Sequence, residues 1–429
     1  MRGEEQKGRK PIRERKLPTP KKQPERSSRA IALEILMDIF EDGRFSHLAL
    51  RETLAKETAL SEKDRALITR IVEGTTELSI QLDYILNRYS SIKVKKMKPL
   101  IRNILRMGAY QLLYLERIPD SAAINEAVKL IKKRGLQGLA GFGNAVLRRI
   151  SREKEEIQTW LQSEEVPAYV RYSLPEWLYN YMCLNFGEEE SIRMAQYFLS
   201  DDNSIYVRYK DGRTEQVHGN VARQADFKSG EMTVQDYASQ QVGIWAAPKP
   251  GDYVVDLCSA PGGKACHVAS LLQGTGRVDA RDVSREKTAM ILENVRRLGL
   301  ENVSVKVWDG RVRDASLVRD GEGIADIVLC DLPCSGLGIL AKKPDIRFSA
   351  SLEGIQSLQR LQRELLQVAV QYVKHGGRLL YSTCTITREE NEQNVRFMTE
   401  QLGLRLLRSQ RFMPGQPSDG FFIAELVKD

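Results

Sequence analysis

Apolar residues recur at helical spacing through residues 29–152. The first such stripe consists of Ile31, Ile35, Leu36, Ile39 and Phe40. A second stripe follows Pro99 and comprises Leu100, Ile101, Ile104, Leu105, Leu112 and Leu113. Stripes of this kind are typical of helices that bury one face against their neighbours. The pattern therefore predicts an all-α bundle over residues 29–152, with packing faces rather than ligand sites.

Two capping signals mark where helices of this bundle are expected to begin. Ser61 stands three residues before Asp64, an arrangement that satisfies free amide groups at the start of a helix. Asp120 or Ser121 is expected to cap a helix that runs over residues 122–133.

Residues 153–250 show a different pattern, which predicts a small α+β connector. A helical stretch over residues 174–200 is followed by the alternating segment 204–209 and then by Asp211-Gly212, which indicates a strand and a turn. Ser229-Gly230 marks a second turn.

Residues 251–429 alternate between short apolar runs and longer amphipathic segments. The expected strands cover residues 253–257, 277–282, 303–307, 326–330, 378–382 and 421–426. The expected helices cover residues 265–273, 284–298, 352–374 and 388–402. Because strands and helices alternate, we expect an α/β domain with a parallel sheet and helices on both of its faces.

Length and composition narrow the class of protein. A chain of 429 residues is too long for one ordinary core, so we expect two or three domains. A hydrophobic content of 42% with 28% charged residues fits a soluble globular protein. No apolar run approaches the roughly 20 residues that span a bilayer, and the N-terminus lacks the apolar centre of a secretory signal. We therefore expect a cytoplasmic protein with no membrane contact.

The net charge of +8 is concentrated at the N-terminus, where residues 1–28 hold ten Lys or Arg and four Asp or Glu. Together with several prolines, this composition predicts a disordered basic tail. Such a tail suits a polyanion such as RNA, or serves only to keep the chain soluble. A second basic run, which either contacts phosphates or forms a solvated face, comprises Lys93, Lys95, Lys96, Lys98 and Arg102.

Six cysteines are present: Cys183, Cys258, Cys266, Cys330, Cys334 and Cys384. In the cytosol they should stay reduced. The chain has no CxxC pair and only four His, so we expect no metal site. Inert packing explains Cys183, Cys266 and Cys330 well. It explains Cys334 and Cys384 poorly, because both lie in polar, turn-forming loops that directly follow neighbouring strands.

The first strand of the α/β domain ends in a glycine-rich turn, Asp256-Leu-Cys-Ser-Ala-Pro-Gly-Gly-Lys264. The two glycines let the backbone approach a nucleotide-like ligand, and the following helix offers free N–H groups. The spacing is neither GxGxxG nor a P-loop, which disfavours a dinucleotide. Asp282 could accept the ribose hydroxyls and Asp309 could hold the adenine edge. Either acid alone could be a helix cap, but with Asp331 three acids follow successive strands.

The two loop cysteines suggest a chemistry. Carbon 5 of cytosine is a weak nucleophile, and a thiolate that adds to carbon 6 makes carbon 5 reactive towards a methyl sulfonium. A carboxyl such as Asp331, if protonated, could supply a proton to N3 of the base. A second cysteine could assist proton removal or enzyme release, and the base must be presented out of its stack.

At this point the chain resembles a known family. Asp256–Lys264, Asp331-Leu-Pro-Cys334 and Thr383-Cys384 resemble the cofactor, PC and TC motifs of RNA cytosine-5 methyltransferases. Further matching segments are Gln235-Asp-Tyr-Ala-Ser-Gln240, Lys343-Pro-Asp-Ile-Arg347 and Asp419-Gly-Phe-Phe422. The helical part is similar to the NusB-type RNA-binding domain through Asn125-Glu-Ala-Val128 and Gly143-Asn-Ala-Val-Leu-Arg-Arg149. This pairing resembles the RsmB (Sun) type of bacterial small-subunit ribosomal RNA methyltransferase.

The resemblance implies a Rossmann-like, S-adenosylmethionine-dependent catalytic domain over residues 251–429 and 16S ribosomal RNA as the partner. By motif match, Cys384 is the nucleophile and Cys334 assists product release, with Asp331 beside them. The implied cofactor contacts are Cys258, Ser259, Ala260, Pro261, Gly262, Gly263, Lys264, Asp282, Asp309 and Asp331. Ser259, Ala265 and Leu337 depart from the residues usual in the family, but the departures leave both cysteines and the aspartates intact. We expect a monomer.

Three alternatives remain open from the sequence. The target could be a transfer RNA or another ribosomal cytosine, since only the NusB-like part points to 16S ribosomal RNA. The chain could be a non-catalytic RNA-binding or antitermination factor with a methyltransferase shell, although such a shell need not keep a cysteine pair. The cysteine roles could also be exchanged, because DNA cytosine-5 methyltransferases use the PC cysteine as the nucleophile.

Overall fold

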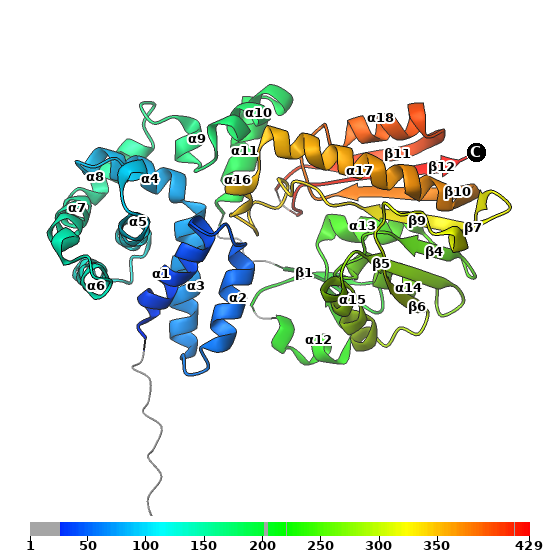
Figure 1. Ribbon diagram of the computed structural model, residues 1–429, viewed down its shortest axis with the longest axis horizontal. Helices are drawn as coiled ribbons and strands as arrows, with labels where there is room; N and C mark the ends of the chain where they lie inside the picture. The colour runs from blue at the N-terminus through cyan, green and yellow to red at the C-terminus, as the bar shows by residue number, and fades with distance from the viewer. Residues whose placement is uncertain (1–25, 201–204, 220, 416) are drawn as a thin grey trace, which may run out of the picture.

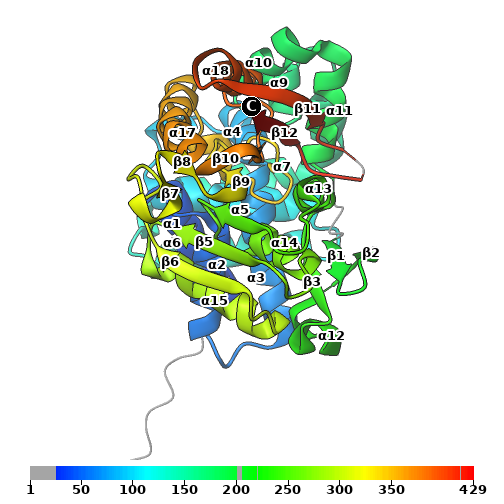
Figure 2. The same ribbon diagram turned by 90° about the vertical axis from the view of Figure 1, so that its right-hand side faces the viewer.

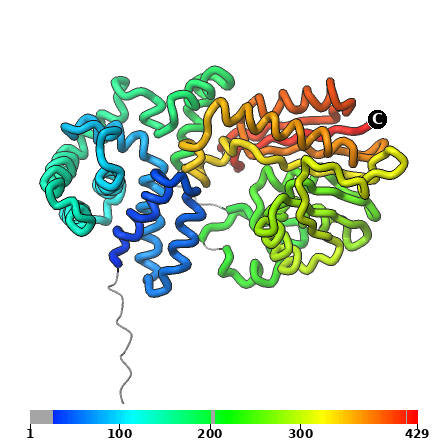
Figure 3. The backbone as a smooth tube through the Cα atoms, in the orientation of Figure 1, coloured from blue at the N-terminus to red at the C-terminus, as the bar shows by residue number. Residues whose placement is uncertain are grey.

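A computed structural model describes residues 26–200, 205–219, 221–415 and 417–429 of the chain. Helices from the first third of the chain gather at one end of the molecule, and a twisted sheet with its helices forms the other end (Figure 1). The smooth trace in Figure 3 shows the same division along the chain. Of the expected tail 1–28, only the last three residues fall within the described part, and Ser204 also lies outside it.

The N-terminal part consists of helices packed around α5, which runs over Pro99–Tyr114 and is the most deeply buried of them. The α-helices are α1 Ser28–Phe40, α2 Ser46–Lys56, α3 Glu62–Glu77, α4 Ser79–Tyr89, α5, α6 Asp120–Lys133, α7 Ala140–Arg152, α8 Lys154–Leu161 and α9 Ala168–Arg171. Gly74 allows α3 to approach α5 closely, because a Cβ there would collide with the ring of Tyr110. The expected all-α bundle is confirmed.

The two capping predictions have different outcomes. Ser61 caps α3, and its side chain accepts a hydrogen bond from the amide of Asp64 at 3.1 Å, as expected. The prediction for α6 is wrong, because α6 already begins at Asp120 and no side chain caps it. Asp120 instead accepts a hydrogen bond from Ser151 at 2.6 Å and therefore ties α6 to α7.

The segment between the bundle and the large sheet begins with helices α10 Glu176–Phe186 and α11 Glu188–Phe198, which are separated at Gly187. It continues with β1 Ile205–Tyr209, β2 Thr214–Val217, α12 Ala225–Ser229, β3 Met232–Val234 and α13 Tyr237–Ala246. The three strands form an antiparallel sheet of order β2-β1-β3. Gly212 in the β1–β2 turn has a φ of +88°, which explains the Asp-Gly turn seen in the sequence.

The large sheet has the order β11-β12-β10-β9-β4-β5-β6. Its strands are β4 Tyr253–Asp256, β5 Arg277–Asp282, β6 Val303–Val307, β9 Ala325–Asp331, β10 Val373–Thr383, β11 Leu404–Phe412 and β12 Phe421–Lys428. Its helices are α14 Gly263–Leu271, α15 Arg285–Leu298, α16 Ile346–Ser349, α17 Leu352–Tyr372 and α18 Glu392–Gln401. The short strands β7 Val318–Arg319 and β8 Glu322–Gly323 pair beside it.

Alternating side chains of the central strands fill two separate cores. Val255, Val328 and Leu379 point to the face that α17 and α18 cover. Val254, Ile327 and Leu380, each one residue away, point to the face that α13, α14 and α15 cover. Figure 2 shows these helix layers on opposite sides of the sheet. Burial on both faces explains the near-continuous apolar runs of these strands. The expected α/β domain of Rossmann-like architecture is confirmed.

The sheet differs from the expectation at one edge. β12 runs antiparallel to both of its neighbours, so the sheet is mostly rather than wholly parallel. The edge strand β11 was not expected at all. Six consecutive side chains of β11, from Arg405 to Gln410, are exposed, and its leucines are mixed with polar residues without the alternation that would have signalled a strand.

Candidate functional site

The glycine-rich loop and the two cysteine loops meet at the carboxyl ends of β4, β9 and β10. The chain runs from β4 to β5 and β6 on one side and then returns to β9 and β10 on the other. Ligands bind where the strand order reverses in this way. A cavity of about 290 Å³ opens at this place, and Lys264, Asp282, Asp331, Cys334 and Cys384 are among the residues that line it.

The glycine-rich loop leads from β4 into α14. Gly262 has a φ of +100°, and a Cβ there would lie 3.2 Å from Cγ2 of Ile291. No atom would lie within 4 Å of a Cβ on Gly263, so the backbone is open at the first residue of α14. The amide of Ser259 donates to the carbonyl of Arg281 at 2.8 Å and fixes the loop to β5. Of the predicted loop residues, Cys258, Ala260 and Lys264 line the cavity.

Asp282 ends β5 and turns its carboxylate towards the same loop. It accepts hydrogen bonds from the amides of Ala260 at 3.0 Å and Val283 at 2.8 Å. The ammonium group of Lys287 lies 3.1 Å from Oδ1 of Asp282, and Lys287 also lines the cavity. Sequence reasoning did not identify Lys287. Its position one helical turn into α15 was the available signal, because a cation there can reach the end of β5.

Asp309 follows β6 near the end of β5, because the amide of the preceding Trp308 donates to the carbonyl of Asp282 at 2.9 Å. It is not among the residues that line the cavity. Its carboxylate forms an ion pair with Arg311, only two residues later, at 2.7 Å. The hydrogen bonds from Arg311 lower the pKa of Asp309, so the group is ionised at neutral pH.

The two loop cysteines are in direct contact: Sγ of Cys334 lies 3.3 Å from Sγ of Cys384. A hydrogen bond from the Cys334 thiol lowers the pKa of Cys384, and the charges of Lys264 and Lys343 add to this effect against burial and Asp331. The same hydrogen bond and burial raise the pKa of Cys334 well above its ordinary value. The arrangement therefore favours a Cys384 thiolate beside a neutral Cys334 thiol.

The other cysteines near the sheet are unsuited to be nucleophiles. Burial and the surrounding carboxylates raise the pKa of Cys258. Burial likewise raises the pKa of Cys330 well above its ordinary value, and of Cys266 to about 11. Thiols of this kind remain protonated at neutral pH, so Cys384 is the thiol in the cavity most readily ionised.

Asp331 and Lys264 form an ion pair beside the cysteines. The Lys264 ammonium lies 2.6 Å from Oδ2 of Asp331, and the Ser382 hydroxyl donates to Oδ1 at 2.8 Å. Burial opposes the charge of Lys264, but Asp331 outweighs it and raises the pKa of Lys264. The proton-donor role expected from the sequence requires a protonated Asp331, whereas here both oxygens of its carboxyl group accept hydrogen bonds, from Lys264 and Ser382.

A buried carboxylate, Glu390, fixes the two cysteine loops to each other. It accepts hydrogen bonds from the amide of Ser335 at 2.8 Å and from its hydroxyl at 2.6 Å. It also accepts from Thr387 at 2.7 Å and from Gln362 at 3.1 Å. Because Ser335 directly follows Cys334 and Glu390 belongs to the loop after Cys384, this carboxylate sets the separation of the two sulfurs. Sequence reasoning missed Glu390.

Two of the family-like segments, those that contain Asp236 and Asp419, meet at the cavity wall. Lys342 lies 2.7 Å from the carboxylate of Asp419 and 3.3 Å from that of Asp236. Tyr197 donates to Asp419 at 3.2 Å. These residues come from four distant segments, so no spacing in the sequence could have placed them together.

Asp256, the last residue of β4, is buried beneath the glycine-rich loop. Neither of its carboxylate oxygens has a hydrogen-bond partner among the described residues, and the same is true of the buried Ser259 hydroxyl. Burial, with the charge of Asp331 as a second cause, raises the pKa of Asp256 to about 7. Asp256 is therefore partly protonated at neutral pH.

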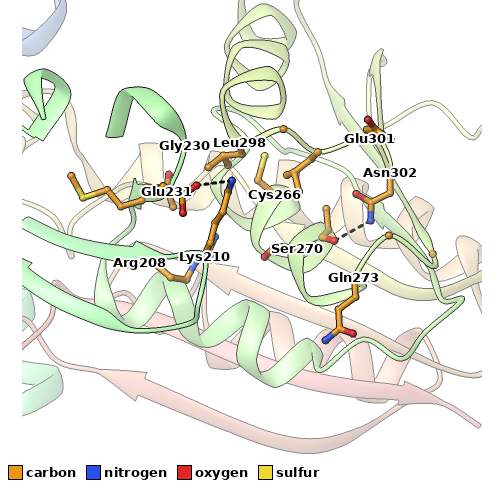
Figure 4. Close-up of a pocket in the computed structure, with 17 residues that line it drawn as sticks. Arg208, Lys210, Gly230, Glu231, Cys266, Ser270, Gln273, Leu298, Glu301 and Asn302 are labelled. Carbon is orange, nitrogen blue, oxygen red and sulfur yellow. Dashed lines mark hydrogen bonds and ion pairs between the residues drawn. The ribbon is translucent and has the colours of Figure 1, made fainter. Parts of the chain in front are cut away.

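A second cavity, of about 750 Å³, lies between the small sheet and α14 (Figure 4). Of the predicted cofactor and catalytic residues, none lines it. Lys210 extends towards Glu231, whose carboxylate is 3.1 Å away. Arg208 lies beneath them with 7% of its surface exposed and donates to Gln235 at 3.1 Å.

Within the described ranges, no group of three or more His, Cys, Asp or Glu side chains could hold a metal ion. Of the helices in the described part of the chain, none is both long and apolar enough for a membrane crossing. In the basic run of α5 and the turn before it, Arg102 pairs with Glu41 at 2.7 Å. The four lysines of that run are exposed.

Comparison with known proteins assigns both parts of the chain. The family model described as 16S rRNA methyltransferase RsmB/F matches residues 243–427, and the NusB family model matches residues 26–152. The probable ribosomal RNA small subunit methyltransferase B of Bacillus subtilis (strain 168) is 33% identical over 394 residues, which cover 86% of this chain and 87% of that protein. The ribosomal RNA small subunit methyltransferase B of Escherichia coli (strain K12 / MC4100 / BW2952) is 29% identical over 441 residues, 94% of this chain and 99% of that protein.

Solved structures agree with this assignment. The crystal structure of PH0851 superposes with a TM-score of 0.75 at 26% identity and covers 94% of this chain and 98% of that one. The structure of NSun6 from Pyrococcus horikoshii with SFG superposes with a TM-score of 0.52 at 22% identity, over 59% of this chain and 98% of that one, and supports the fold alone. The chain therefore belongs to the ribosomal RNA small subunit methyltransferase B family, in which a NusB domain precedes an S-adenosylmethionine-dependent RNA methyltransferase domain.

Proposed function

We propose that this protein methylates carbon 5 of a cytosine in 16S ribosomal RNA through a covalent bond between Cys384 and carbon 6 of the base. One observation carries the proposal: Cys384 lies 3.3 Å from Cys334, and its surroundings lower its pKa while those of Cys334 raise the pKa of that thiol. A pair of thiols with pKa values shifted in opposite directions is suited to a nucleophile and an acid.

The residues around the glycine-rich loop fit S-adenosylmethionine. The open backbone at Gly263 allows close approach, and the Asp282 carboxylate lies where ribose hydroxyls can replace the loop amide as donors. We assign the loop from Cys258 to Lys264, with Asp282 and Asp331, to the binding of this group, and Asp309 to its adenine end. When bound, S-adenosylmethionine supplies an electrophilic methyl group.

The protein's own groups account for the steps at the base. The Cys384 thiolate forms a bond to carbon 6, and N3 takes up a proton while carbon 5 becomes nucleophilic. Lys264 donates to Asp331 across 2.6 Å, and this pair can supply a proton to N3 and accept a hydrogen bond from the neighbouring amino group. After methylation, carbon 5 loses its proton to solvent water, N3 returns its proton to the Lys264–Asp331 pair, and the sulfur of Cys384 leaves carbon 6 as the double bond is restored. The Cys334 thiol can protonate the departing sulfur across 3.3 Å.

The covalent step can be tested by incubating unmodified 16S rRNA and S-adenosylmethionine with the wild-type protein and three variants. Cys384→Ala should abolish methyl transfer and form no protein–RNA adduct. Cys334→Ala should methylate the base but accumulate an adduct that survives denaturing gel electrophoresis, because release is slowed. Cys183→Ala changes a half-buried cysteine remote from the cavity and should behave like the wild type.

Two outcomes would contradict the proposed roles. An adduct that persists in Cys384→Ala and is missing in Cys334→Ala would make Cys334 the nucleophile. Full transfer by both variants would exclude a covalent cysteine mechanism altogether.

Within 16S rRNA, we propose cytosine 967 as the nucleotide that is methylated. The family membership and the NusB domain support a ribosomal target over a transfer RNA. Bisulfite sequencing of 16S rRNA from a strain that lacks the gene should show one unprotected cytosine, and complementation with the wild-type gene but not Cys384→Ala should restore its protection. We further propose that the protein acts as a cytoplasmic monomer, which light scattering after size-exclusion chromatography would test.

A further inference from the structure

An aromatic and basic surface lies where the N-terminal bundle meets the α/β domain. It consists of Phe45, His47 and Arg51 at the start of α2, and of Lys343 and Phe348 around α16, and we call these five residues the junction patch. The start of α2 lies next to the start of α16 although some 300 positions separate them in the chain, and Figure 1 shows α16 above the upper end of α2. The side chain of Ser46 donates to that of Asp345 across this boundary.

The two phenylalanine rings of the junction patch are exposed, and the ring of Phe348 is supported by the bundle. Phe45 is 50% exposed and Phe348 is 41% exposed, and both line one cavity of about 340 Å³. The ring of Phe348 packs edge-on against Phe40, with ring centroids 5.5 Å apart. Arg106 covers Phe40 at 4.6 Å from its ring. Large apolar rings held in this way present flat faces to solvent without being free to collapse into the core.

The backbone that carries Phe348 is fixed by its neighbour Arg347. The Arg347 guanidinium is 1% exposed and donates to the carbonyls of Glu77 at 2.5 Å and Ser173 at 2.8 Å. These acceptors belong to the bundle and to the segment before α10. The junction patch is therefore preformed, and binding at its surface requires little ordering of the protein.

The charges of the patch are available to a partner. Arg44, Arg102 and Arg106 line the same cavity, but each already pairs with carboxylates of the bundle. Arg51 and Lys343 have no ion pair among the described residues. Unpaired cations beside exposed aromatic rings are the side chains that bind phosphates and stack on unpaired bases.

Lys343 connects the junction patch to the cysteine cavity. Its neighbour Lys342 contacts Asp419, which lines that cavity together with Ile339. The charge of Lys343 acts on both the junction patch and the cysteine cavity. It adds to burial in lowering the pKa of His47, and it contributes to the lowered pKa of Cys384. A strand whose target base enters the cavity can therefore reach the patch along Lys343.

We infer that the junction patch binds unpaired bases of the substrate RNA next to the target cytosine, by stacking on Phe45 and Phe348 and by phosphate contacts to Arg51 and Lys343. The inference rests on the proposed function, because it places the target base in the cysteine cavity. Stacking of one base on one ring typically contributes about 5- to 150-fold in affinity when tested by alanine substitution.

The test compares Phe45→Ala and Phe348→Ala with Phe45→Trp and Phe348→Trp, using a 16S rRNA fragment with its target cytosine in a single-stranded loop. Each alanine variant should bind the RNA roughly 10-fold more weakly, raise KM for RNA and leave kcat and the affinity for S-adenosylmethionine unchanged. Each tryptophan variant should bind the RNA as tightly as the wild type does, because Trp also offers a ring for stacking. Leu184→Ala, at an apolar side chain 86% exposed on α10, is the matched control and should have no effect.

Salt dependence separates the two kinds of contact. Arg51→Gln should remove one phosphate contact and so reduce the slope of log affinity against log salt concentration by about 1. The phenylalanine variants should keep the wild-type slope. If the wild type methylates the fragment but the alanine variants bind it equally well, the inference is wrong while the proposed function stands. If the variants lose affinity only for a subunit particle and not for naked RNA, the patch binds protein and the inference is likewise wrong. If the wild-type protein does not methylate the fragment, the result would instead contradict the proposed function.

Discussion

Substitution of Asp256 by Asn should make the catalytic domain more stable at alkaline pH. Burial raises the pKa of Asp256 to about 7 in the folded chain, compared with an ordinary value of 3.8. Because the folded state holds this proton more tightly than the unfolded state, the stability of the fold declines as the pH rises from about 4 to about 7 and stays reduced above that. Asn cannot ionise, so it removes this dependence.

The size of the effect follows from the two pKa values. A difference of roughly three powers of ten in proton affinity lowers the free energy of unfolding of the wild type by about 4 kcal/mol at pH 8. At pH 5 the loss is only about 1.5 kcal/mol. The advantage of Asp256→Asn over the wild type should therefore grow by about 2.5 kcal/mol between these pH values. For a domain of this size, that change corresponds to a gain of about 5–10 °C in the difference between their Tm values.

The assay is thermal and urea unfolding of both proteins at pH 5 and pH 8 without ligand, followed by a signal from the catalytic domain. Asp320→Asn is the matched control, since Asp320 is exposed in a turn with a φ of +53° that Asn accepts. An Asp256→Asn variant whose stability varies with pH as steeply as that of the wild type would refute the reasoning.

Further predictions concern the cysteine loops and the N-terminus. Cys334→Ala removes the hydrogen bond that lowers the pKa of Cys384, so alkylation of Cys384 by iodoacetamide should need a higher pH; a pH profile that does not move would contradict this. Glu390→Gln places an amide donor against the donors of Ser335 and should slow adduct formation at unchanged RNA affinity, which rapid-quench kinetics would measure. Removing residues 1–25 leaves Ser27 to cap α1, and it should weaken RNA binding and flatten its salt dependence; unchanged affinity across a salt titration would leave the tail a solubilising role.

The parts of the site that the sequence predicted share one physical origin. Asp282 and Asp331 end strands that the apolar pattern revealed, and Cys334 and Cys384 come shortly after such strands. Parallel strands end at the same edge of a sheet. Their neighbourhood therefore follows from topology alone. The edge strand β11 mixes exposed leucines with polar residues and has no regular alternation. The apolar pattern of β12 does not report the direction in which that strand runs.

The parts that the sequence did not predict depend on contacts between distant segments. Glu390 is one of many acids in a polar stretch, and only the fold directs its carboxylate at Ser335. Lys342 meets Asp236 and Asp419 from loops that are far apart in the chain. Asp309 had the expected position after a strand, but nothing in the pattern showed that Arg311 would occupy its carboxylate.

The buried guanidinium of Arg347 has a consequence for how the chain acquires its structure. Its acceptors, the carbonyls of Glu77 and Ser173, are synthesised long before Arg347 itself, so the helices at the N-terminus can already be folded when the catalytic segment emerges from the ribosome. A catalytic domain produced alone would have to bury this cation without acceptors or expose the face around it. The N-terminal half should therefore be needed for the catalytic domain to fold. The C-terminal half produced by itself should be insoluble, and co-expression of the two halves should restore its solubility.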